Sequence, residues 1–87
     1  MKPRITINTT KDGEFEIWLN ESGRDLLVRE LLSLSEKSDH FHFMPEEIEL
    51  SNIAYRAEDI IFEYGKVYFR PEDWDRKHFP HVLAKQS

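Results

Sequence analysis

The chain has 87 residues, enough for one domain with one core, and its 39% hydrophobic and 13% aromatic residues exclude a disordered tail. The net charge of −5 disfavours direct nucleic-acid binding, because an acidic surface repels phosphates. There is no cysteine, and no apolar run is long enough for a signal peptide or a membrane span, so the sequence predicts a cytoplasmic protein without disulfides or thiolate metal sites.

Two alternating segments at the start of the chain predict a hairpin over residues 5–19. Asp12-Gly13 supplies the positive φ that the turn needs. If the apolar residues face inward, Trp18 shares the outer face with Glu14 and Glu16. So large an outward ring indicates cover by a partner or by the C-terminal tail. The residues expected to face inward are Ile5, Ile7, Phe15, Ile17 and Leu19.

A helix is predicted after Asn20, where Ser22 and Asp25 have the S-x-x-D spacing of a helix start and Ser22 is the expected cap. Apolar residues then recur every three or four positions, so one helix face should cover the sheet. This stripe favours core packing over a dimerisation zipper, since it lasts barely two heptads. Its members are Leu27, Val28, Leu31, Leu32 and Leu34.

The segment from Asp39 to Pro45 predicts a strand with two unlike faces. Phe41 and Phe43 can enter a core only if His40 and His42 stand together on the opposite surface. Two such rings could bridge a metal ion, but a site would need further ligands from the tail. Ordinary surface histidines without a cofactor are the favoured interpretation. The candidate tail ligands are Glu72, Asp75, His78 and His81.

Three further β-segments are expected beyond Pro45. Residues 47–51 alternate, with their two aliphatic side chains inward, whereas residues 52–59 fit a loop, a bulged strand or a helical turn. Segments 60–64 and 66–70 are rich in β-branched and aromatic residues. They predict a second hairpin.

The expected fold is α+β, a mostly antiparallel sheet of five or six strands with one amphipathic helix packed on one face. The element order is strand, strand, helix and then three or four strands. Residues 1–87 should form a single domain, with 1–70 as its core and 71–87 as a partly ordered tail. In the tail Pro71 suits the start of a short helical turn, and the last residues should fray.

Catalysis is not expected from these residues. No carboxylate is placed in an apolar pocket, and no serine has a neighbouring base. The three glycines cannot build a phosphate-binding loop of a familiar pattern. The sequence therefore favours a binding protein over an enzyme.

A polar hairpin, the helix Asp-Leu-Leu-Val-Arg-Glu-Leu-Leu at residues 25–32 and the strand Asp-His-Phe-His-Phe at residues 39–43 follow one another in this chain. This order resembles small immunity proteins of bacterial polymorphic toxin systems and is most similar to the immunity protein 32 family. The resemblance covers roughly residues 3–70, with His40 and His42 as the matching motif positions. It implies a non-enzymatic protein that binds a cognate toxin and blocks it.

The leading hypothesis is a protein-binding domain whose acidic surface meets a basic partner such as a toxin domain, with Trp18 as aromatic anchor. A plainer interpretation of the acidity is solubility. The alternatives are a small metal-binding or regulatory domain centred on His40 and His42, and a structural accessory module. The predicted partner contacts are Glu14, Glu16, Trp18, His40, His42, Glu46, Glu47 and Glu49.

Overall fold

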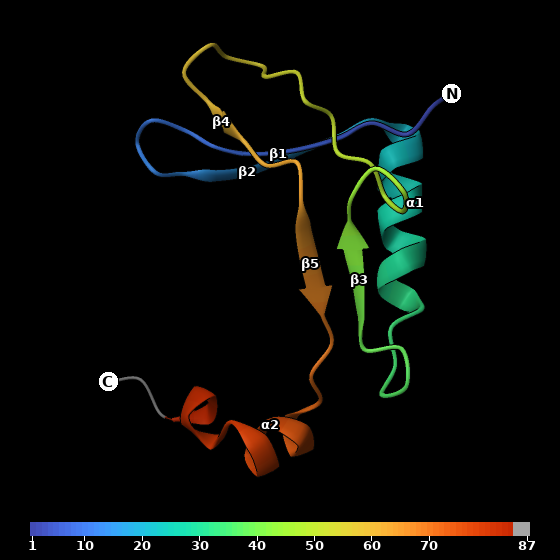
Figure 1. The fold of residues 1–87 in the computed structure, drawn as a ribbon, viewed down its shortest axis with the longest axis vertical. Coiled ribbons are helices and arrows are strands. Elements are labelled where there is room, and N and C mark those ends of the chain that lie inside the picture. The colour runs from blue at the N-terminus through green and yellow to red at the C-terminus, as the bar shows by residue number, and fades with distance from the viewer. Residues whose placement is uncertain (85–87) are drawn as a thin grey trace.

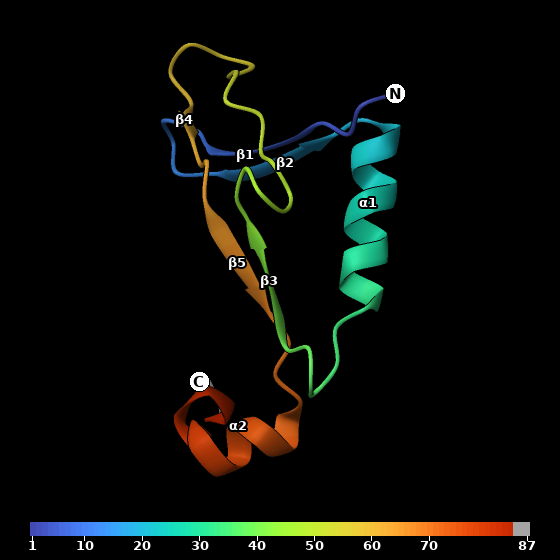
Figure 2. The same ribbon diagram turned by 45° about the vertical axis from the view of Figure 1, so that its right-hand side comes forward.

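The computed structural model describes residues 1–84 and has an α+β fold (Figure 1; Figure 2). Its elements are β1 (Ile5–Thr9), β2 (Phe15–Leu19), α1 (Glu21–Leu32), β3 (His40–Phe43), β4 (Ile60–Ile61), β5 (Gly65–Tyr68), α2 (Glu72–His78) and a 3-10 turn (Pro80–Leu83). One sheet has the order β2-β1-β4, and the other pairs β3 with β5. The predicted single sheet of five or six strands is therefore wrong, because the strands of this part of the chain divide between two small antiparallel sheets.

The first hairpin is confirmed. β1 and β2 pair antiparallel from Ile5↔Leu19 to Thr9↔Phe15. Gly13 has a φ of 83° and donates its backbone N–H to the Thr10 carbonyl oxygen at 2.9 Å. Only glycine adopts such a φ at little cost, so the local sequence fixes this turn.

The predicted second hairpin does not form. β4 pairs with β1, at Asn8↔Ile61, whereas β5 pairs with β3, from His40↔Tyr68 to Phe43↔Gly65. The chain crosses from one sheet to the other between β4 and β5, as the separated gold and brown strands of Figure 1 show. Both segments find partners far away in sequence, which alternation within the segments cannot specify.

Residues 44–59 link β3 to β4 without forming a regular strand. Phe43 and Ile48 make an isolated parallel bridge, and the Ser51 N–H donates to the Ile5 carbonyl oxygen at 2.7 Å. The predicted inward aliphatic residues, Ile48 and Leu50, are buried. The ambiguous stretch 52–59 is a loop with a turn at its centre.

Asn20, not the predicted Ser22, caps α1. The Asn20 Oδ1 accepts from the Gly23 N–H at 2.7 Å and from the Arg4 N–H at 2.9 Å, and Ser22 lies inside the helix. A side chain at Gly23 would collide with the Arg4 carbonyl oxygen. This close approach fastens the start of α1 to the chain that leads into β1.

The buried core is small. It consists of Ile5, Phe41, Phe43, Ile48 and Leu50, and it is covered in part by Leu26 and Leu27 of α1 and by Leu34, which follows the helix. The prediction that the whole leucine stripe is buried is wrong, because part of the stripe stays exposed, and so does much of the apolar face of β2. One continuous sheet would have buried the apolar face of β2 and the leucine stripe of α1 against each other, whereas the two small sheets leave part of both exposed. The exposed residues of these two faces are Phe15, Ile17, Leu19, Val28, Leu31 and Leu32.

The predicted helical turn after Pro71 is confirmed as α2. It stands at the lower end of the molecule in both views, far from the β1–β2 hairpin (Figure 1; Figure 2). The Arg70 guanidinium lies 4.3 Å from the centre of the Trp74 ring and also binds Asp39 at 2.8 Å. Part of the expected fraying concerns residues 85–87, which lie outside the described residues. Neither described helix is both long and apolar enough to cross a bilayer.

Candidate protein-binding surface

A shallow acidic groove of about 490 Å³ lies between the tip of the β1–β2 hairpin and the loop that precedes β4. Carboxylates outnumber cations along it by five to two. Lys11 binds Glu58 at 3.3 Å, and Arg56 binds both Glu16 and Asp59. Asp12 and Glu14 form no ion pair with any of residues 1–84. The charged residues of this acidic groove are Lys11, Asp12, Glu14, Glu16, Arg56, Glu58 and Asp59.

Asp59 forms the floor of the acidic groove, with only 2% of its side chain exposed. Its Oδ1 accepts from the Arg56 Nε at 3.2 Å, while its buried Oδ2 has no hydrogen-bond partner among the described residues. The hydrogen bond to Asp59, helped by the charges of Asp59 and Glu16, raises the pKa of Arg56. A buried carboxylate oxygen without a donor is costly, and because this oxygen lies beneath the surface, Asp59 gives the groove negative charge and not a direct contact.

Trp18 is covered by this chain's own loop. Its ring stacks on Tyr55 with 4.0 Å between ring centres and 14° between ring planes, and its Nε1 donates to the Asn8 Oδ1 at 2.9 Å. The Arg56 guanidinium also lies 5.6 Å from the ring centre. Trp18 therefore needs neither a partner nor the C-terminal tail to cover it. The loop 52–59, whose conformation the sequence left open, supplies the cover.

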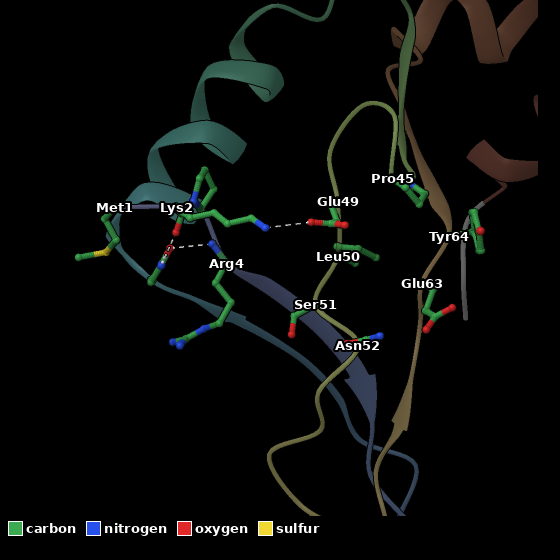
Figure 3. A pocket seen from close by; sticks show the side chains of 12 residues that line it. Met1, Lys2, Arg4, Pro45, Glu49, Leu50, Ser51, Asn52, Glu63 and Tyr64 are labelled. Atoms are coloured by element: carbon green, nitrogen blue, oxygen red, sulfur yellow. Dashed lines mark hydrogen bonds and ion pairs between the residues drawn. The ribbon is translucent and has the colours of Figure 1, made fainter.

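The turn after β3 carries the other predicted acidic contacts. The Glu47 carboxylate accepts from the His42 backbone N–H at 3.3 Å and lies 3.5 Å from its Nδ1. Glu49 binds Lys2 at 3.5 Å in the mouth of a cavity of about 630 Å³ (Figure 3). Glu46 is exposed and forms no ion pair within residues 1–84. This turn is therefore acidic, but two of its three carboxylates already have partners.

The predicted histidine face of β3 is confirmed. Phe41 and Phe43 are buried, and His40 and His42 lie on the opposite surface with 5.0 Å between ring centres. The His40 Nδ1 lies 2.9 Å from the Asp39 Oδ1. This hydrogen bond, together with the charge of the nearby Arg70, lowers the pKa of the Asp39 carboxyl below its ordinary value of 3.8.

The predicted tail ligands are not gathered with His40 and His42. Within residues 1–84, no three His, Asp or Glu side chains are close enough together to hold a metal ion. His78 packs 4.6 Å from Trp74, and His81 packs 6.0 Å from Phe79, both measured between ring centres. The two histidine pairs thus belong to separate surfaces.

The structure brings Glu14 and Glu16 together in one groove and sets Glu47 beside His42. Sequence reasoning missed Arg56 and Asp59, because their loop has no periodicity that places it against the hairpin. The acidic pair Glu58-Asp59 was the one sign in the sequence that this loop could belong to an acidic surface. No protein-family model matches the chain, and no curated protein or solved structure does.

Proposed function

We propose that this chain is a non-enzymatic protein-binding domain that neutralises a cognate bacterial toxin by placing its acidic groove against a basic cleft. The observation that carries the proposal is the excess of carboxylates in the acidic groove, where Asp12 and Glu14 form no ion pair with any of residues 1–84. The resemblance of residues 25–32 and 39–43 to toxin immunity proteins supports the same class of partner.

The physical basis of such neutralisation is the replacement of phosphates by carboxylates. A toxin cleft that binds a nucleic acid carries Lys and Arg side chains, and an acidic surface competes for them. Opposite fields also speed the encounter, which favours capture of the toxin before it acts. Glu46 is exposed on the turn after β3 and adds to the net negative charge of the chain.

The experiment is a rescue assay in bacteria that express the product of the gene next to this one, which the proposal identifies as the cognate toxin. The parent chain should restore growth, and the double variant Glu14→Lys, Glu58→Lys should lose much of this protection, because it reverses the charge of the acidic groove. The double variant Glu36→Lys, Glu72→Lys is the matched control, since it makes the same change in net charge outside that groove. Failure of the parent to protect, or equal protection by both variants, contradicts the proposal.

Metal binding at the histidine face is the second candidate. The Nδ1 atoms of His40 and His42 lie beside Asp39 and Glu47, the arrangement that commonly orients a metal-binding imidazole. Two ligands alone bind weakly, so we expect micromolar zinc to leave the melting temperature unchanged. A clear rise that His40→Ala removes would instead favour the metal-binding function.

A further inference from the structure

A second, apolar groove lies on the opposite face of β2 from the acidic groove. It has a volume of about 410 Å³ and lies between the hairpin, α1 and the start of β5. Phe15 and Ile17 remain 61% and 45% exposed in it. The residues that define this apolar groove for the argument below are Ile7, Phe15, Ile17, Leu31, Phe62 and Val67.

The chain exposes more surface than a stable monomer of its size. Its accessible area is 6860 Å², whereas a folded monomer of 10.5 kDa exposes about 5,400 Å². The radius of gyration is 15.4 Å, against about 12 Å for a compact domain of this length. The projecting α2 contributes to both differences, but the unburied faces of β2 and α1 contribute as well. A stable interface buries about 800 Å² on each partner, and the exposed apolar side chains of β2 and α1 would supply part of that area.

Charge decides which partner fits the apolar groove. Lys66 is the only charged residue among the described residues that line it. Two copies of a chain with net charge −5 repel each other wherever their carboxylates meet, so they can associate only over a surface without them. A basic partner, by contrast, gains nothing from this neutral groove and is attracted to the acidic groove on the other face of β2.

We infer that two copies of this chain associate through their apolar grooves. The contact is isologous, so each copy presents the same patch and buries its partner's Phe15, Ile17 and Leu31. The dimer completes a core that one chain leaves half covered, and it keeps both acidic grooves on the outside. The inference does not depend on the proposed function.

The test is the mass of the purified chain in solution, measured by sedimentation at 10 to 200 μM. The parent should have about twice the 10.5 kDa of one chain. Ile17→Lys should give monomers, because it places a charge in the contact. Ile53→Lys should stay dimeric, since Ile53 is exposed but lies outside the apolar groove. High salt should leave the dimer intact, because the contact is apolar.

A monomeric parent over the whole range overturns the inference, as does a dimeric Ile17→Lys. Circular dichroism checks that each variant is folded. If Ile17→Lys does not fold, Leu31→Lys on α1 makes the same test from the other wall. The parent alone gives a further result that needs no variant. Its melting temperature should rise with protein concentration, and a constant value contradicts the dimer.

Discussion

At the scale of single residues, the side chain of Asn8 links Trp18 to Glu16 at the edge of the acidic groove. It is buried, accepts a hydrogen bond from Trp18 and donates one to Glu16 at 3.1 Å. Its amide therefore satisfies the indole N–H under the Tyr55 ring and holds one carboxylate at the edge of the acidic groove. A buried polar residue in the middle of β1 costs little stability, because both the oxygen and the nitrogen of its amide have hydrogen-bond partners.

Asp39 makes stability depend on pH at the other end of the molecule. Its pKa is lowered in the folded state, so its contribution is present above the unfolded value and is lost as the pH falls through the folded value. Asp39→Asn should therefore melt at a lower temperature than the parent at pH 7. The difference should shrink as the pH drops below 3.8. Thermal unfolding at pH 7, 5 and 3 checks this, and a difference that stays constant with pH contradicts the ion pair.

The loss of stability caused by an Ile→Ala substitution should depend on how deeply the isoleucine is buried. Ile5 is 1% exposed and Ile53 is 74% exposed. Ile5→Ala should destabilise the chain by about 2 to 5 kcal/mol, because it leaves a cavity in the small core. Ile53→Ala should change the stability by no more than about 0.5 kcal/mol. Denaturant unfolding of both variants measures the difference, and similar losses would show that the core is misplaced.

At the scale of elements, substitution of the two candidate capping residues, Asn20 and Ser22, shows where α1 begins. Asn20 accepts from Gly23 and also ties down Arg4, so Asn20→Ala should cost about 0.5 to 2 kcal/mol. Ser22→Ala should be close to neutral, because Ser22 lies inside the helix. Chemical denaturation compares the two variants. A larger loss for Ser22→Ala would restore the start predicted from the S-x-x-D spacing.

Elements whose signals are local could be predicted from the sequence. The first hairpin follows from alternation and from Asp12-Gly13, and the two faces of β3 follow from its Phe and His residues. The partners of β4 and β5 could not be predicted, because pairing across long stretches of chain leaves no local pattern. The same holds for the site: Glu14 and Glu16 were predicted, whereas Asp59 depends on where a loop without periodicity folds back.

At the scale of the whole molecule, the alternation of side chains along β2 places two kinds of surface on opposite faces of the strand. Glu16 faces the acidic groove, while Phe15 and Ile17 face the apolar groove. The proposed basic partner and the proposed second copy would therefore approach from different sides. In the proposed dimer the acidic groove stays available, so one dimer would hold two of the proposed basic partners.

The most direct test of the central claim is the rate at which the purified chain associates with the product of the neighbouring gene, the proposed toxin, measured by stopped flow across a range of salt. The parent should bind fast at low salt and lose rate steeply as salt rises. Glu14→Lys, Glu58→Lys should bind more slowly by about tenfold or more at low salt, with a flatter salt dependence, while Glu36→Lys, Glu72→Lys should stay closer to the parent. Equal rates and equal salt dependence for the two double variants, or no binding by the parent, would contradict the assignment of the acidic groove as the toxin-binding surface.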